Sequence, residues 1–507
     1  MKQGISYIKK NTPWCILFFC CFFSKLVSAQ VEFKLNDSCL IAQQHIYNFQ
    51  FNEANRILES QKKINPNNIA IDWLQENTLF YKNFISEDKK LFEASEKKWA
   101  QLISNVHKKQ FNNAWYRFVL SEMHFHKALI KLRFNEYYSA AGDIKTCHQL
   151  LKENKKMFPS FLADNKTYGS LLCVFSTIPT KYQFLSKLTG FEGDMKQGLT
   201  ELETYIKSDQ TYKEHHWIQK EAVFSYAMIQ HLLNKNSDLA WQITQENTMD
   251  YQQSVFSNYM RARIAAYAGL NETIIETIDK KPNIKHHPFP YMDYMMGLAK
   301  LRKLDLHAAI HFNTYIQQYK GQHLIKSSYR YLAWLNIISN KKNLVELHYN
   351  NCIKYGNSQS EDDKQAFKEA TETTRWTAHS IKARLLFDGK YYDKALAELN
   401  LISPNEMTHL KHQIEYHYRK ARIYHETKDF QKAIYEYERT IELGENQSYY
   451  FAAYSAIYLG NIYEDKNQKQ MAKTYYLKAK NGFKANKEYN NSIEQKAKTG
   501  LKRLNEI

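Results

Sequence analysis

One spacing of small and large side chains recurs three times near the end of this 507-residue chain, and it constrains the fold more than any other feature. In residues 381–399 the small residues are Ala383 and Ala395, and large apolar residues follow them by three and four positions. Steps of three and four keep side chains on one helix face, and small residues let two helix axes approach closely. Residues 418–443 and 458–479 repeat the pattern, so we expect stacked helix–turn–helix units of about 40 residues.

The scarcity of glycine and proline supports the same conclusion. The chain contains 15 glycines and 8 prolines, far below the roughly 12% that average usage would supply. Hairpins, barrels and Rossmann crossovers need such turn residues at short intervals. We therefore expect an all-α protein, whose length suits two to four domains or one long helical array.

The repeated pattern resembles the tetratricopeptide repeat, a helix–turn–helix unit with small residues where its two helices cross. The second-helix alanines Ala395, Ala433 and Ala472 lie 38 and 39 residues apart, which exceeds the usual spacing of about 34 and predicts longer connections. The resemblance implies an α-solenoid of such helix pairs. Weaker matches occur upstream, at residues 51–66, 135–144 and 304–312.

These matches suggest a division of the chain into five parts. Repeat-like helices are expected from about Asn36 to the C-terminus, with a less regular stretch in the middle. The parts are a signal peptide (1–29), N-terminal tetratricopeptide-like helices (30–154), an irregular helical middle segment (155–250), further tetratricopeptide-like helices (251–374) and a C-terminal tetratricopeptide array (375–507).

The middle segment carries a second resemblance. It is similar to a eukaryotic group of tetratricopeptide proteins, the inclusion-body-clearance and tetratricopeptide-repeat-39 family, whose members have a glycine, an apolar run ending in Ser-x-x-Pro, and then Gly-Phe-x-Gly-Asp followed by Gly-Leu. The resemblance informs fold more than activity, and the signal peptide is a departure because those relatives are intracellular. The matching residues are Gly169, Ser176, Pro179, Gly190, Phe191, Gly193, Asp194, Gly198 and Leu199.

The three clustered glycines of this segment predict a helix corner rather than a phosphate-binding loop. A Walker loop needs Gly-Lys-Ser/Thr, whereas Gly193 is followed by Asp194 and Met195. We expect Gly190 to close one helix in the left-handed conformation, Asp194 to cap the next, and Gly198 to permit a close helix crossing.

The first 29 residues have the three parts of a secretory signal peptide. Lys2, Lys9 and Lys10 precede an apolar run at residues 14–23, and Val-Ser-Ala follows at residues 27–29. The run is short for a membrane-spanning helix, which needs about 20 residues. We expect an exported protein in the periplasm or cell envelope of a Gram-negative bacterium, with an uncleaved N-terminal anchor as the alternative.

The net charge favours acidic partners, but the basic residues are not gathered in one stripe of the sequence. The chain carries +18, and +14 remains without the four lysines of the signal peptide. Its lysines are scattered as pairs, as at Lys89-Lys90 and Lys341-Lys342. Such a charge favours acidic proteins or peripheral contact with an anionic membrane, and export argues against nucleic acid.

Motifs for catalysis and metal binding are missing from the sequence. No HExxH helix and no GxSxG elbow occurs. The paired histidines at 124 and 126, 215 and 216, and 286 and 287 are interpreted as surface or packing residues. We predict no catalytic, cofactor or metal site, no cofactor and no enzyme activity. The cysteines beyond the signal, which we expect to be mostly buried thiols with room for one bridge, are Cys39, Cys147, Cys173 and Cys352.

The remaining hypothesis is binding in the groove formed by the first helix of each repeat. Counting from the small residues predicts which side chains face inward, and Arg and Tyr among them are common in binding hot spots. We expect a scaffold that binds a protein or peptide in this groove. The alternatives are a glycan-binding protein of the cell envelope and an adaptor at an anionic membrane surface. The predicted groove residues are Arg384, Phe387, Tyr418, Arg422, His425, Tyr454 and Asn461.

Overall fold

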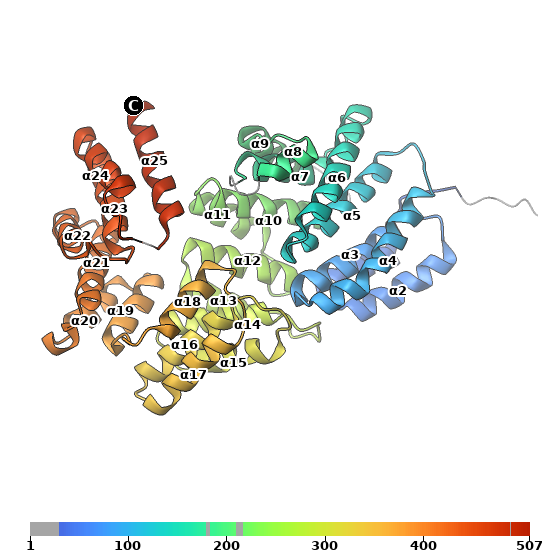
Figure 1. Ribbon diagram of the computed structural model, residues 1–507. Coiled ribbons are helices and arrows are strands. Elements are labelled where there is room, and N and C mark those ends of the chain that lie inside the picture. Colours follow the sequence, from blue (N-terminus) through green and yellow to red (C-terminus); the bar gives the residue numbers. More distant parts are fainter. Residues whose placement is uncertain (1–29, 179–182, 209–215, 487, 507) are drawn as a thin grey trace, which may run out of the picture.

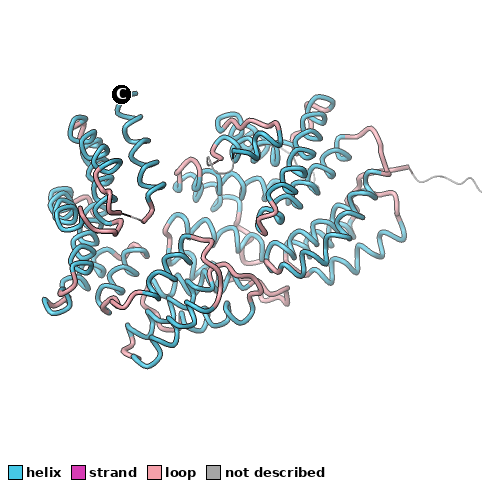
Figure 2. Tube along the Cα trace, in the orientation of Figure 1, coloured by secondary structure: helices cyan, strands magenta, loops and turns pink. Residues whose placement is uncertain are grey.

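The structure is a computed structural model, and it describes residues 30–178, 183–208, 216–486 and 488–506. These residues form 25 α-helices and a short 3-10 turn, with no β-strand among them (Figure 1 and Figure 2). The expected all-α class is therefore confirmed. Pro179 and His215, which the sequence analysis singled out, lie outside the described residues.

The helices pack as consecutive antiparallel pairs. In the N-terminal part the pairs are α1 (Asp37–Tyr47) with α2 (Phe51–Ile64), α3 (Ile69–Ser86) with α4 (Lys89–His107), α5 (Ala114–Arg133) with α6 (Tyr137–Met157), and α7 (Asp164–Ser176) with α9 (Met195–Ile206). The short helix α8 (Gln183–Thr189) lies between α7 and α9 in the sequence. Three more pairs follow: α10 (His216–Leu232) with α11 (Ser237–Asn247), α12 (Val255–Ala268) with α13 (Asn271–Asp279), and α14 (Pro290–Arg302) with α15 (Ala308–Gln318).

The C-terminal part continues the pairing with two exceptions. Its pairs are α16 (Ile325–Ile338) with α17 (Lys342–Lys354), α19 (Ala378–Asp388) with α20 (Tyr392–Asn400), α21 (Leu410–Glu426) with α22 (Phe430–Gly444), and α23 (Phe451–Asp465) with α24 (Lys469–Asn481). The first exception is α18 (Glu361–Thr371), which packs on α16 and α17, and the second is α25 (Asn490–Glu506), which packs on α23 and α24. A 3-10 turn (Pro404–Met407) precedes α21.

The small residues of the repeat pattern lie at the helix crossings, as expected. Ala395, Ala433 and Ala472 are completely buried, and a Cβ at Gly460 would lie 2.5 Å from the ring of Tyr476 on the paired helix. These units are tetratricopeptide-like helix pairs, and the chain is an α-solenoid of them.

The turn inside nearly every pair uses one backbone device. After the first helix one residue adopts the left-handed conformation, and the next amide then binds a carbonyl five residues earlier, as from Tyr391 to Leu386 and from Gln468 to Tyr463, both at 2.8 Å. This Schellman bond satisfies carbonyls at the helix end. The left-handed residues followed by this bond are Phe49, Asn135, Gly269, Leu304, Asn340, Lys390, Lys428 and Asn467. Glu87 and Lys235 are left-handed at the same place in their pairs, and the amide after Lys235 binds a carbonyl six residues earlier.

The N-terminal pairs curl until their first and last members meet. The amide of Val255 donates to Asn48 Oδ1 at 3.0 Å, and the amide of His287 donates to the carbonyl of Phe49 at 2.8 Å. Tyr47 of α1 stacks on Trp217 of α10, with ring centroids 4.2 Å apart. The inner face of α3, α5, α7 and α10 is therefore enclosed, and one apolar core extends from Leu35 to Ala299.

The glycine corner has the predicted geometry. Gly190 has a φ of +64°, and the carboxylate of Asp194 accepts the amide of Gln197 at 2.9 Å, which caps α9. Gly198 lies where α9 crosses α7, so a Cβ there would be 2.5 Å from Cys173 Sγ and 2.7 Å from the carbonyl of Gly169. The glycines therefore permit a tight helix crossing.

The substitution Gly198→Ala should destabilise the protein by about 1–3 kcal/mol, because the added methyl group meets a backbone carbonyl that cannot move freely. Gly142→Ala in α6 is the matched control: nothing lies within 4 Å of its Cβ position, and alanine should stabilise that helix by up to about 1 kcal/mol. Urea unfolding of both variants measures the difference. Equal effects at the two positions would contradict the crossing.

The four cysteines beyond the signal segment are buried in the described part of the chain. Cys39, Cys147, Cys173 and Cys352 are all buried and unpaired, so the expected thiols are confirmed. Within the described residues, no helix combines the length and the apolar character needed to cross a bilayer.

Candidate functional site

The C-terminal array differs from the N-terminal part because its inner face stays open. The first helices of its repeats, α19, α21 and α23, lie side by side, and α25 continues the row (Figure 1). A cavity of about 480 Å³, named the groove cavity below, lies on this face. It is lined by Lys235, His425, Ile457, Tyr458, Asn461, Glu464, Asp465, Lys496, Thr499 and Arg503.

Two of the predicted groove residues, His425 and Asn461, line this cavity. Arg422 lies directly beside it and donates to the hydroxyl of Tyr458 at 2.7 Å. Its guanidinium also stacks between two rings, 4.3 Å from the centroid of Tyr458 and 5.0 Å from that of Phe387. The structure therefore brings four of the predicted residues into one neighbourhood.

The other three predicted residues do not line this cavity. Tyr418 is only 3% exposed and packs on Phe451, so it belongs to the core and offers no surface to a partner. Tyr454 is half-buried against α25: its hydroxyl lies 3.1 Å from Ser492 Oγ, and its ring lies beside Lys496 of the cavity. Arg384 lines a separate, smaller cavity.

Sequence analysis missed the contribution of α25, which supplies Lys496, Thr499 and Arg503 to the cavity. A signal was present in the sequence. The first-helix small residues Ala383, Ala421 and Gly460 are followed, at a similar interval, by Ala497, which is completely buried. The final helix is thus the first helix of one more repeat.

The groove cavity contains an ion pair and a lysine that has no such partner among the described residues. Arg503 binds Glu464 through two hydrogen bonds of 2.8 and 2.7 Å, and these bonds hold the pKa of Glu464 below its usual value. Lys496 forms no ion pair within the described residues; burial lowers its pKa, and its ammonium lies 4.7 Å from the ring centroid of Tyr454. Burial also lowers the pKa of His425. The cavity therefore presents an unmatched cation beside aromatic rings.

A larger cleft of about 750 Å³ lies between the N-terminal corners and the loops that flank α16 and α18. In this cleft Glu87 binds Arg133 and also accepts a hydrogen bond from the hydroxyl of Tyr319 at 2.5 Å, which links three of its segments. Lysines outnumber acids along its wall. The charged lining residues are Glu87, Asp88, Lys89, Lys90, Arg133 and Lys320.

One group of described side chains has the composition of a metal site. Glu122, His126 and Glu221 meet in the enclosed N-terminal core. The ammonium of Lys166 lies between the two carboxylates, bound to Glu122 and 2.5 Å from Glu221 Oε2. His126 is held by Glu76 at 3.0 Å, which raises its pKa although burial acts against this. The lysine thus already supplies the cation that these carboxylates require.

Comparisons with known proteins show no family for this chain. No protein-family model and no curated protein matches the chain. Among solved structures, 59 chains match, including the crystal structure of the P58(IPK) TPR domain, which is 12% identical with a TM-score of 0.21 and covers 85% of this chain and 99% of that one. At that TM-score the two chains do not superpose as a whole. The tetratricopeptide-like architecture is therefore established by the helix pairs described above, and the resemblance of the middle segment remains a prediction.

Proposed function

We propose that this protein is an exported, non-catalytic scaffold that binds a segment of another protein in the groove cavity of its C-terminal array. The observation that carries the proposal is the contrast between the two inner faces. Side chains fill the N-terminal one, whereas the C-terminal one retains a cavity of about 480 Å³ to which α21, α23 and α25 all contribute. Helical-repeat proteins present such concave faces to extended segments or helices of their partners.

The lining favours a partner that carries both an acidic and an aromatic or apolar group. Lys496 offers a cation that forms no ion pair with the described residues, and Tyr458 offers an aromatic ring. Tyr and Arg side chains with limited freedom are frequent binding hot spots. In this cavity Tyr458 is fixed by the hydrogen bond from Arg422 and by stacking on Tyr437 at 5.6 Å.

A pull-down from envelope extract with residues 30–507 tests this function. We expect a defined protein to remain bound after a high-salt wash. The double variant His425→Ala and Lys496→Ala should lower its retention about tenfold or more, because both side chains line the cavity. The matched control is Tyr435→Ala with Lys469→Ala, which removes one ring and one lysine from exposed positions on α22 and α24.

Equal loss in both double variants would show that the groove cavity is not the binding surface. If no protein survives the wash but a glycan or a lipid co-purifies with the bait, the scaffold function is wrong and a ligand-binding role replaces it. The cleft with Lys89, Lys90 and Lys320 would then be the first surface to test for anionic lipid, because such binding collapses with salt.

A further inference from the structure

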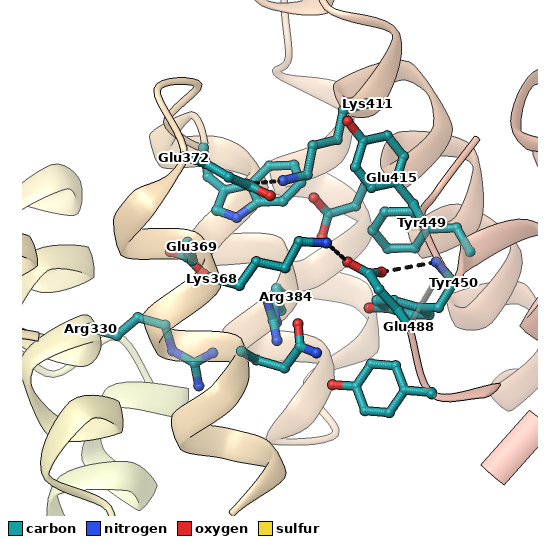
Figure 3. Close-up of a pocket in the computed structure, with 14 residues that line it drawn as sticks. Arg330, Lys368, Glu369, Glu372, Arg384, Lys411, Glu415, Tyr449, Tyr450 and Glu488 are labelled. Carbon is teal, nitrogen blue, oxygen red and sulfur yellow. Dashed lines mark hydrogen bonds and ion pairs between the residues drawn. The ribbon is translucent and has the colours of Figure 1, made fainter. Parts of the chain in front are cut away.

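A second cavity in the C-terminal half has an unusual charge arrangement. It measures about 40 Å³ and lies where α18 meets α16, α19 and the beginnings of α21, α23 and α25 (Figure 3). This volume holds a small ion or a few water molecules. The charged residues around it are Arg330, Lys368, Glu369, Glu372, Arg384, Lys411, Glu415 and Glu488.

Each of the four carboxylates already has a partner. Figure 3 shows Lys368 bound to Glu488 and Lys411 bound to Glu372. A third, Glu415, binds Arg419 through Oε1 at 2.9 Å, and its buried Oε2 has no hydrogen-bond partner among the described residues. The fourth, Glu369, accepts the indole N–H of Trp334 at 2.5 Å and the hydroxyl of Tyr349 at 2.8 Å.

The two arginines have no such partner. Among the residues that the structure describes, no carboxylate lies within 4.0 Å of the guanidinium of Arg330 or Arg384. Both side chains line this one cavity, and their guanidinium carbons lie 5.0 and 4.9 Å from the ring centroid of Trp334. Asp362, the remaining acid near Arg330, is exposed and forms no ion pair with it.

Burial makes this arrangement costly for Arg330. Its side chain is only 3% exposed, its Nε has no hydrogen-bond partner, and its one bond is a long one of 3.3 Å to Tyr331. An arginine removed from water without a carboxylate or sufficient hydrogen bonds costs several kcal/mol. Stacking on an aromatic ring recovers a part of this. An anion between the two guanidiniums would recover the rest.

We propose that this cavity is a binding site for a tetrahedral oxyanion of the phosphate class. Arg330 and Arg384 are the principal ligands, because guanidinium forks match phosphate oxygens. The amide of Gln365 and the hydroxyl of Tyr489 also line the cavity, and neither forms a hydrogen bond with another described side chain. Donors thus come from four separate segments, which suits a tetrahedral ion better than a planar carboxylate. This site is independent of a partner in the groove cavity.

Isothermal titration of residues 30–507 with inorganic phosphate tests the site. We expect saturable binding, and a melting temperature that rises with phosphate but not with chloride of the same ionic strength. Arg384→Gln should weaken binding about tenfold or more. Arg330→Gln should do the same, and the half-buried Arg384 keeps the test interpretable if that variant does not fold. The control Arg439→Gln removes one charge from an exposed pair with Glu442 and should bind phosphate as the unmodified protein does.

Two further probes define the ligand. If phenyl phosphate binds as well as inorganic phosphate, the ligand is the phosphate group of a larger molecule. If phenyl phosphate does not bind, the ligand is the free phosphate ion. Acetate that binds as well as phosphate would overturn the proposal. So would the absence of saturable phosphate binding, or an equal response of Arg384→Gln and Arg439→Gln.

Discussion

Replacing Lys166 by methionine should lower the free energy of unfolding by about 3–5 kcal/mol. Lys166 is 4% exposed, and its ammonium is bound by the carboxylates of Glu122 and Glu221. These two carboxylates raise its pKa although burial acts in the opposite direction. Without the lysine, both carboxylates remain buried with no cation between them, which is the most costly way to break a buried ion pair. Urea denaturation followed by circular dichroism measures the loss.

The matched control for this change is Lys145→Met. Lys145 is exposed on α6 and forms no ion pair with the residues that the structure describes, so its replacement should change stability by less than about 0.5 kcal/mol. Adding Glu122→Gln to the Lys166→Met variant should restore part of the lost stability, because it removes one of the two unpaired charges. A Lys166→Met variant as stable as the Lys145→Met control would show that the network is not charged in the folded protein.

The helix pairs were predictable from sequence because their determinants are local. Ala395, Ala433 and Ala472 contact a helix that lies only a few residues away in the chain, so their spacing records the crossing directly. The turns between the helices were harder to predict from the sequence. Their left-handed residues are mostly Asn, Lys or Leu rather than glycine, since the Schellman hydrogen bonds compensate the strain at a position such as Lys390.

The enclosed N-terminal core and the composition of the groove cavity could not be predicted in the same way. Tyr47 and Tyr81 both bind Glu221, which lies more than a hundred residues further along the chain. No periodicity records such a contact. In the groove, counting along one helix predicts that His425 faces inward, and His425 lines the cavity, but counting could not show that Tyr418 is covered by Phe451 of the next repeat.

Stability should depend on pH through Asp164, which the structure buries at the start of α7. Burial raises its pKa from the usual 3.8 to about 7, although Asn154 donates to both carboxylate oxygens at 3.1 and 2.9 Å. Because the folded pKa is the higher one, its contribution to stability is fully present below pH 3.8 and is lost as the pH rises through 7. The full loss amounts to about 4 kcal/mol.

Asp164→Asn should therefore leave stability nearly unchanged at pH 4 and raise it at pH 8, compared with the unmodified protein. The opposite sign is expected for Asp143→Asn. Burial opposes ionisation of Asp143 too, but hydrogen bonds from His124 at 2.7 Å and Lys131 at 2.6 Å lower its pKa. Its contribution is present above pH 3.8 and is lost as the pH falls through the lower folded pKa, so Asp143→Asn should destabilise at pH 8. Urea unfolding of both variants at pH 4, 6 and 8 gives the two trends, and trends of the same sign would mean that a carboxylate in one of the two sites is not in the charge state assigned to it.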